Sequence, residues 1–565
     1  MSHTLDSNIQ RLKQRLDRFL VGLSRRKYGQ RRSEPPSPTV SRVLPGLPLE
    51  LWTLILRHAC TSLSIPDPLD TSQPISFLTP THLHRSHYAA SMRQKCNFSL
   101  VSKRWHSFTQ EVLYEFVWIS CAAQAKALAL TLLSQACQYA PLNPTKEVMI
   151  GCQSGRYIRR LHIETSTLER CDPTDLRTIL DYSPQLLIYS DQRSIRRSLY
   201  ASTAEKYSDH YSSPQKLLSA LAHPNNNLRR LSWTNYDDAS FHLHMSPTLR
   251  STSANLEFLE LTFVSANPPH RFPPSIGLPA HLSGDLDPSA HALALPNLRS
   301  LKVTLDNDAF SVLSTWSMPR LVNLSVVSAD FSYAGEGFAQ FFRVHGSILN
   351  QLELGHSSSS IEEHWLTSPA FPLLPNNPNS QNHNLSASIP LAKWCPNLTQ
   401  FVCSADAEWN WRTPDWIAPH ILLPAHPTLE FIGIRDIDLR MLSDLEVVPD
   451  RIHRDLTNET PFFRLKGQIE TLLGLPQGLP TASSKPFPGL KYVRDMSLGS
   501  HLMRMGRSDV EGPELRVVKF WENILESCKG QDVWLEDCYG VNVTRRDLGK
   551  VKMHARGHPV TCHIS

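Results

Sequence analysis

A short apolar pattern, L-x-x-L-x-L or a close variant, recurs along most of this 565-residue chain and constrains its fold more than any other feature. Copies that begin at Leu298 and Leu321 are 23 residues apart, and the next begins 28 residues later at Leu349. Repetition at such a period indicates similar structural units stacked side by side. The clear copies are Ile158-Leu161-Ile163, Leu228-Leu231-Trp233, Leu256-Leu259-Leu261, Leu298-Leu301-Val303, Leu321-Leu324-Val326 and Leu349-Leu352-Leu354, and the weaker ones are Leu398-Phe401-Cys403, Leu429-Ile432-Ile434 and Leu490-Val493.

The stretches between these copies favour helices. Residues 309–316 and 337–344 are apolar on one side at helical spacing. A short apolar strand followed by a helix, repeated with this period, resembles the leucine-rich repeat. The predicted fold class is therefore α/β, with a small helical region followed by an irregular leucine-rich-repeat-like solenoid. An ordinary α/β domain with similar strands is the alternative.

The copies are unevenly spaced along the chain. The longer gaps leave room for insertions or for a degenerate copy, such as residues 186–189, which follow the copy at Ile158 by 28 residues. Three stretches rich in Pro, Asn, Ser or Gly, at 265–296, 369–390 and 475–489, are typical of surface loops. We expect the solenoid over residues 121–540 and a tail over residues 541–565.

Charge is concentrated at the start of the chain. The net charge is +5, and residues 1–43 hold ten Lys and Arg against three acidic residues, which leaves 47 basic and 49 acidic residues in the rest. A nearly neutral body argues against nucleic acid as the main ligand. Residues 1–43 are predicted to form a basic amphipathic helix and a linker, with self-association or nuclear import as alternative roles.

The sequence gives no sign of secretion or of membrane insertion. The N-terminus is polar, unlike a signal peptide, and the most apolar run, residues 117–140, contains Lys126 and several Gln. Eleven cysteines, an odd number without a Cys-x-x-Cys pair, favour reduced thiols. The expected location is therefore the cytoplasm, the nucleus or both.

A search for enzyme motifs finds none. The sequence has no Walker loop, no Gly-x-Ser-x-Gly and no His-Glu-x-x-His. His554 and His558 have helical spacing, but Gly557 and Pro559 disfavour a helix there. We therefore predict a protein that is not an enzyme and uses no metal or cofactor, with an unrecognised hydrolase or transferase as the alternative.

Two segments between residues 44 and 116 follow a different pattern. The first reads Leu47-Pro48-x-Glu50-Leu51-Trp52-x-x-Ile55-Leu56, and the second reads Ser99-Leu100-Val101-Ser102-Lys103-Arg104-Trp105. Together they resemble the F-box. Residues 113–119, and residues 155–163 beyond a further helix, look like the region that follows the F-box in fungal F-box proteins.

The F-box resemblance implies that the chain binds a Skp-type adaptor and, through it, a cullin–RING ubiquitin ligase. We expect the F-box-like domain over residues 44–120. An inserted loop near residues 61–86 separates its two halves, and this departure from the family leaves the middle of the motif open. The resemblance assigns the adaptor contacts to Leu47, Pro48, Leu51, Ile55, Val101 and Trp105.

In a leucine-rich-repeat array, the residue between the last two apolar positions faces the concave side. The function implied is a substrate-recognition subunit of a Skp–cullin–F-box ligase, which recruits an unknown protein target for ubiquitination. The alternatives are a protein-interaction scaffold with no ligase role, and helices that only cap the solenoid. The substrate-binding residues expected on the concave side are His162, Ser232, Glu260, Lys302, Ser325 and Glu353.

Overall fold

The computed structural model divides the chain into two units, Met1–Trp52 and Thr53–Ser565. The division falls inside the first helix that the structure describes, and the second unit holds the sheet described below. The structure describes residues 48–60, 72–78, 82–139, 154–166, 168–191, 194–195, 214–221, 227–234, 249–262, 292–305, 307–328, 336–356, 391–405, 423, 425–447, 463–474, 485–505 and 515–548.

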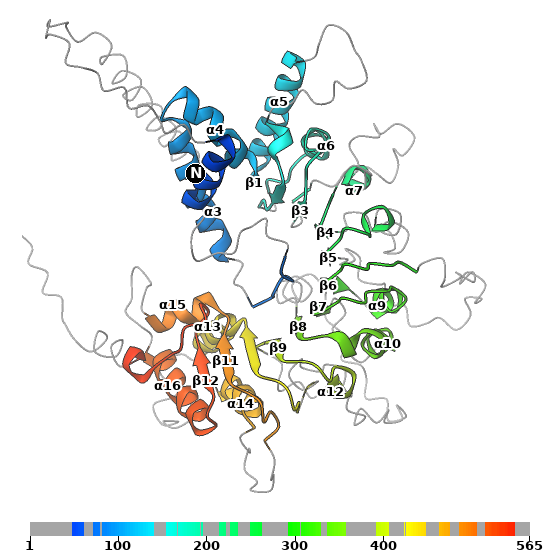
Figure 1. The fold of residues 1–565 in the computed structure, drawn as a ribbon. Coiled ribbons are helices and arrows are strands. Elements are labelled where there is room, and N and C mark those ends of the chain that lie inside the picture. Colours follow the sequence, from blue (N-terminus) through cyan, green and yellow to red (C-terminus); the bar gives the residue numbers. More distant parts are fainter. Residues whose placement is uncertain are drawn as a thin grey trace, which may run out of the picture. The chain divides into compact units, whose positions relative to one another are not determined.

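Within these residues, twelve strands form one sheet in which every neighbouring pair is parallel and the spatial order equals the sequence order (Figure 1). This sheet, alternating with helices, confirms the predicted α/β class and is consistent with a leucine-rich-repeat-like solenoid. The strands are β1 (Phe116–Ile119), β2 (Arg160–Ile163), β3 (Ile188–Asp191), β4 (Arg230–Thr234), β5 (Phe258–Thr262), β6 (Ser300–Leu305), β7 (Asn323–Ser328), β8 (Gln351–His356), β9 (Gln400–Ser404), β10 (Phe431–Arg435), β11 (Tyr492–Asp495) and β12 (Trp534–Glu536).

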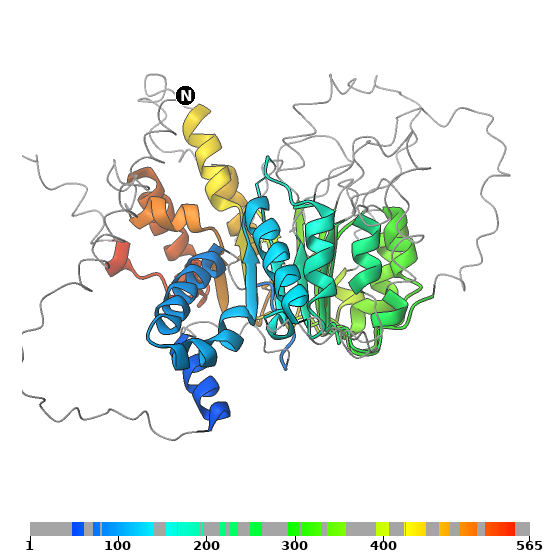
Figure 2. The ribbon, with the colours of Figure 1, turned by 90° about the horizontal axis from the view of Figure 1, so that it is seen from above.

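Helices precede the sheet and connect its strands. Figure 2 shows the connecting helices between β1 and β8 lying side by side on one face of the sheet. Before the sheet come α2 (Leu49–Cys60), α3 (His82–Ser99) and α4 (Lys103–Tyr114). The others are α5 (Ala122–Tyr139), α6 (Pro173–Asp181), α7 (Pro214–Leu221), α9 (Asn307–Leu313), α10 (Glu336–His345), α12 (Leu391–Trp394), α13 (Ile437–Val447), α14 (Phe463–Leu472), α15 (Leu498–Met505) and α16 (Leu515–Gly530).

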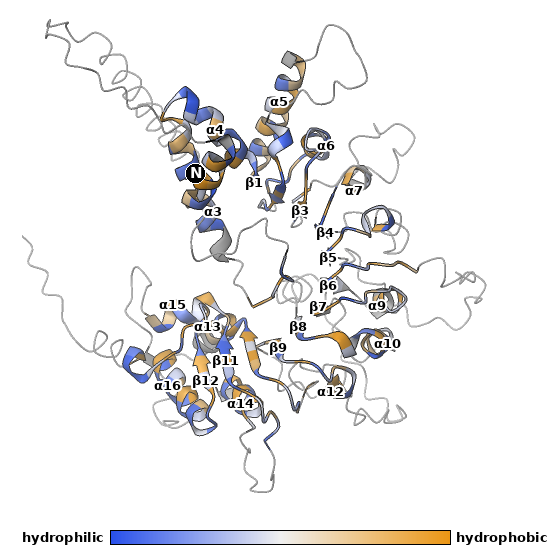
Figure 3. Cartoon of the chain, in the orientation of Figure 1, coloured by the Kyte–Doolittle hydropathy of each residue, from blue (hydrophilic) through white to orange (hydrophobic). Residues whose placement is uncertain are grey.

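The recurring pattern forms the core between the sheet and its helices. In the copy that contains β7, Leu321, Leu324 and Val326 are fully buried, and the same holds for the corresponding residues of the neighbouring copies. Apolar residues, orange in Figure 3, recur along the strands and in the helices that cover them. Successive side chains of a strand point to opposite faces, so the residue between the last two apolar positions faces away from this core.

The backbone ladder continues one residue ahead of the strands from β2 to β11. Arg299 N donates to Glu257 O at 2.9 Å, and Val322 N donates to Arg299 O at 2.8 Å. Short strands of three to six residues are therefore joined by additional hydrogen bonds, which satisfy backbone groups that would otherwise be buried without a partner.

Several local expectations differ from the structure in detail. The degenerate copy near residue 186 forms β3, and the second segment of the F-box-like pattern, residues 99–105, spans the division between α3 and α4. The division occurs because Ser102 caps α4, its hydroxyl accepting a hydrogen bond from Trp105 N at 3.2 Å. The helix α3 begins at His82, inside the segment 61–86 predicted to be a loop.

Some predicted segments lie outside the described residues. These are the basic segment 1–43, the loop 369–390, and most of the loops 265–296 and 475–489 and of the tail 541–565. Among the helices that the structure describes, none is both long enough and apolar enough to cross a bilayer.

Candidate functional site

The strand register brings one residue from each strand into a single row across the face that lies opposite the core. All six predicted substrate-binding residues fall in this row. The sequence reasoning missed its other members, some of which lie in copies with weak leucine patterns. In order from β1 to β12 the row is Trp118, His162, Ser190, Ser232, Glu260, Lys302, Ser325, Glu353, Val402, Gly433, Arg494 and Glu536.

The first part of the row is linked by contacts between its own members. The His162 ring stacks edge-on to Trp118 at 4.3 Å, and His162 Nδ1 lies 3.0 Å from Ser190 Oγ. Burial lowers the pKa of His162, although Glu164 opposes this effect. A buried neutral imidazole beside a hydroxyl and an indole favours packing and hydrogen bonding over a charge-based contact.

Two oppositely charged members of the row form an ion pair. Lys302 Nζ lies 2.7 Å from Glu260 Oε1 on the neighbouring strand. Burial alone would raise the pKa of Glu260, but Lys302 and then Ser232 outweigh it, so the pKa lies below its ordinary value. The attraction of Glu260 likewise raises the pKa of Lys302. Both groups therefore stay charged at neutral pH and stabilise one another across the two strands.

The second part of the row contacts a segment from far away in the sequence. Glu353 forms an ion pair with Arg435 at the end of β10, and Arg435 Nη2 donates to the carbonyl of Phe77. Residues 72–78, part of the expected loop 61–86, thus lie on this face of the sheet, where Figure 1 draws them in blue near β6–β8. Ser325 is fully buried, and its Oγ has no hydrogen-bond partner among the described residues.

The helix α2 carries a second candidate surface. Leu51, Leu54 and Ile55 are 44, 49 and 46% exposed and follow the three- and four-residue spacing of one helical face. On the other side of the same helix Leu56 and Cys60 are buried. An exposed apolar stripe of this kind is typical of a protein-binding surface.

The other predicted adaptor contacts are also accessible where they are described. Pro48 is exposed, Val101 is 61% exposed, and Trp105 is half-buried with its ring 5.7 Å from that of Phe98. Leu47 lies outside the described residues. The sequence reasoning missed Leu54 and also Leu100, which is 83% exposed; both could be found from their position beside Ile55 and Val101.

A charged cluster joins the helices to the edge of the sheet. Arg57 Nη2 in α2 lies 2.9 Å from Glu111 Oε1 and 2.6 Å from Glu115 Oε1 at the end of α4. Arg159, just before β2, approaches the same carboxylates at 3.6 and 3.7 Å. Burial raises the pKa of Glu115, with Arg57 as the main opposing influence.

Neutral contacts strengthen the same junction. The amides of Arg159 and Arg160 both donate to the carbonyl of Glu115, at 3.1 and 3.0 Å. In α3 the hydroxyl of Tyr88 accepts a hydrogen bond from Trp118 N at 3.1 Å, and its ring packs against Phe116 at 4.9 Å. Backbone and side-chain bonds therefore fix α3 and α4 to the first two strands.

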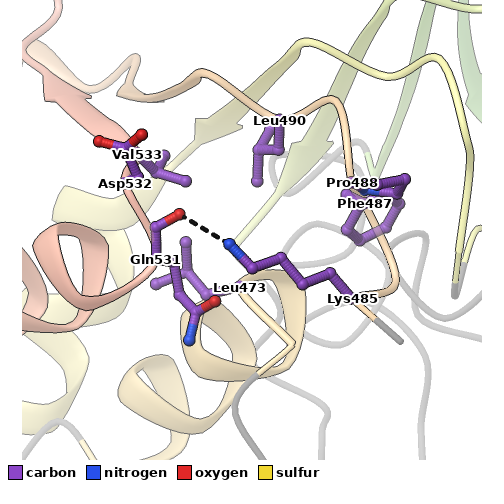
Figure 4. Close-up of a pocket in the computed structure, with 8 residues that line it drawn as sticks. All are labelled: Leu473, Lys485, Phe487, Pro488, Leu490, Gln531, Asp532 and Val533. Atoms are coloured by element: carbon purple, nitrogen blue, oxygen red, sulfur yellow. Dashed lines mark hydrogen bonds between the residues drawn. The ribbon is translucent and has the colours of Figure 1, made fainter. Parts of the chain in front are cut away.

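The described residues hold no group of three or more His, Cys, Asp or Glu side chains arranged for a metal ion. Burial raises the pKa of the thiols of Cys171, Cys395 and Cys528 to about 12, which makes them poor nucleophiles. A small pocket between α14 and β12 is shown in Figure 4, where Lys485 Nζ donates to the carbonyl of Gln531 at 3.2 Å. The ammonium group of Lys485 is therefore bound to a backbone carbonyl beside the pocket.

Comparison with protein-family models gives no match for this chain. Comparison with curated proteins gives no match either.

Proposed function

We propose that the chain is the substrate-recognition subunit of a Skp–cullin–F-box ubiquitin ligase. In this proposal α2–α4 bind a Skp-type adaptor, and the solenoid binds a protein target. The observation that carries the proposal is the exposed stripe of Leu51, Leu54 and Ile55 on α2. Two of these residues are the positions to which the F-box resemblance assigns adaptor contacts, and apolar side chains left half exposed are free to pack on a second protein.

The junction between helices and sheet supports a mechanism based on proximity. Contacts from Arg57 and Tyr88 hold the helices against the first strands, so a target on the solenoid would be held at a fixed position relative to an adaptor on α2. Holding a target beside the ligase raises its effective concentration at the site of ubiquitin transfer. The chain itself would perform no bond chemistry.

The proposal is tested by measuring binding of the full chain to a purified Skp-type adaptor by calorimetry. We expect Leu51→Asp combined with Ile55→Asp to weaken binding by more than about 100-fold, because central apolar contacts in interfaces each contribute about 2 kcal/mol or more. The matched control is Leu130→Asp with Leu133→Asp in α5, where both leucines are also exposed. This control should bind the adaptor as the wild type does.

Two results would contradict the ligase function. If the α2 variant binds the adaptor as tightly as the wild type, the assigned contacts are wrong. If the wild-type chain binds no Skp-type adaptor while its solenoid still captures a protein target, the scaffold without a ligase role is the better description.

A further inference from the structure

Residues 72–78 lie across the concave face of the solenoid, far in sequence from the strands that they contact. Ser300 Oγ in β6 and Asn323 Nδ2 in β7 both donate to the carbonyl of Ile75, at 3.0 and 2.8 Å. In β8, Gln351 Oε1 accepts from Phe77 N at 2.8 Å, and Gln351 Nε2 donates to Ser76 Oγ at 3.1 Å. The segment is thus bound by side chains from three consecutive strands.

Two arginines at the borders of this contact area bind further carbonyl groups of the segment. Arg299 Nη1, just before β6, donates to the carbonyl of Ser72 at 2.6 Å. Arg435 at the end of β10 donates to the carbonyl of Phe77, and the same guanidinium is paired with Glu353. Glu353, one of the predicted substrate-binding residues, therefore positions the arginine that contacts the segment.

Most of these hydrogen bonds are made to backbone atoms of the segment. Three of its carbonyls and one amide are bound by side chains near or within the strands, and Ser76 is bound through its own side chain. Pro74 restricts the residue before it to extended conformations. Hydrogen bonds to the backbone of a peptide, together with burial of one of its side chains, are a common mode of peptide recognition.

Phe77 supplies that one side chain. It is 7% exposed, yet it is not a member of the continuous apolar core that runs from Ile119 to Leu548. The core leucines are covered by the helices, on the opposite face of the sheet. The buried side chain of Phe77 is therefore not part of the apolar core of the solenoid.

We propose that the concave face from β6 to β10 is a binding site for an extended peptide segment of a protein partner, with an aromatic residue at the position of Phe77. Residues 72–78 are the intramolecular occupant of this site, and a partner binds by displacing them. We expect the partner segment to be uncharged, like residues 72–78, whose place it would take. The inference rests on the part of the proposed function in which the solenoid binds a protein target, and it does not depend on adaptor binding.

Attachment to the same chain gives the occupant an advantage over a free peptide. A tethered segment acts at an effective concentration in the range of about 1 mM, so a free peptide competes poorly with it. The test therefore uses the full chain with residues 72–78 replaced by seven alternating Gly and Ser residues. The probe is a fluorescent synthetic peptide with the sequence of residues 72–78, and binding is followed by anisotropy.

We expect the peptide to bind the replaced variant at least about tenfold more tightly than the wild type, in which the site is occupied. Adding Asn323→Ala to the replaced variant should weaken binding by about five- to tenfold, the effect of one lost hydrogen bond. A peptide with alanine in place of Phe77 should lose most of its affinity. The matched control is Asn255→Ala, which lies before β5 and outside the contacts of the segment.

Failure of the peptide to bind a folded replaced variant would overturn the proposal and make the segment a fixed structural strap. Equal binding of the peptide with and without its phenylalanine would overturn it as well. If the replaced variant does not fold, Phe77→Ala in the intact chain takes its place. That substitution keeps the segment but removes its anchor, so the phenylalanine-containing peptide must bind it more tightly than the wild type for the proposal to stand.

Discussion

The apolar residues of the solenoid and those of helix α2 differ in how deeply they are buried. In the sheet, the leucines of the recurring pattern are almost completely buried, as Leu301, Leu324 and Leu352 illustrate. In α2, Leu56 is buried but Leu54, two residues earlier, is half exposed. Each repeat is covered by the repeats on either side of it, so its apolar side chains are buried by other residues of the same chain. On α2, by contrast, Leu51, Leu54 and Ile55 stay about half exposed among the residues that the structure describes.

The largest effect on stability is expected in the core of the solenoid. Leu352→Ala in β8 removes a fully buried side chain that lies between the sheet and its helices. The free energy of unfolding should fall by about 2–5 kcal/mol, because the loss of apolar contacts is accompanied by a cavity. Chemical denaturation measures this value.

Leu168→Ala is the control for this comparison. Leu168 is 95% exposed, so its removal should change the free energy of unfolding by no more than about 0.5 kcal/mol. An equal cost at the two positions would contradict the description of the pattern leucines as the core.

A smaller effect is expected where the two regions meet. Arg57→Ala removes the closest positive charge from the buried carboxylate of Glu115. Leaving a buried charged group poorly paired should lower the free energy of unfolding by about 1–3 kcal/mol at neutral pH. Arg57→Ala combined with Glu115→Gln should recover part of this loss, since the uncompensated charge is then absent.

The control for this prediction is Arg177→Ala, which breaks an ion pair with Asp181 within α6 and should lower the free energy of unfolding by about 0.5 kcal/mol or less.

The loss caused by Arg57→Ala should also depend on pH. Burial already raises the pKa of Glu115, and without Arg57 the pKa rises further. A carboxyl whose pKa is higher in the folded protein binds more protons there, so stability falls as the pH rises from the ordinary value of 4.5 through the folded value. The deficit of the variant should therefore be largest at neutral pH, shrink as the pH falls through the raised folded pKa values, and be smallest near and below pH 4.5. A deficit that is constant across this range would show that the contact acts through packing and not through charge.

The sequence allows the strands with clear copies of the pattern, and six of the twelve residues in the row, to be predicted because both follow from local periodicity. Copies 23 and 28 residues apart place β6, β7 and β8 in order, and the alternation of a strand then places Lys302, Ser325 and Glu353 on one face. The weak pattern at β12, where Trp534 and Glu536 flank Leu535, gives no comparable signal.

The position of residues 72–78 could not be predicted in the same way. Its partners Ser300, Asn323 and Gln351 lie 225, 248 and 274 residues away from the atoms that they bind. A loop rich in turn-forming residues has no periodicity that specifies a distant partner, and the hydrogen bonds involve the backbone of the loop, which every sequence has. Only the three-dimensional arrangement of the strands shows that polar residues at the start of β6, β7 and β8 converge on one carbonyl and one amide.

The smallest change in stability is expected on the exposed side of α2. Comparison with the buried side of the same helix shows most clearly how exposed and buried apolar residues differ. Leu54→Ala should alter the free energy of unfolding by no more than about 0.5 kcal/mol, since its side chain is half exposed and alanine favours the helix. Leu56→Ala on the buried side of the same helix should cost about 2–5 kcal/mol. Under the proposed function the order reverses for adaptor binding measured with folded protein, because Leu54 would contact the adaptor directly whereas Leu56 would act only through the helix. A Leu54→Ala variant that is as destabilised as Leu56→Ala would mean that the exposed side of α2 is already covered by its own chain in solution, and the adaptor would then have no apolar stripe to bind.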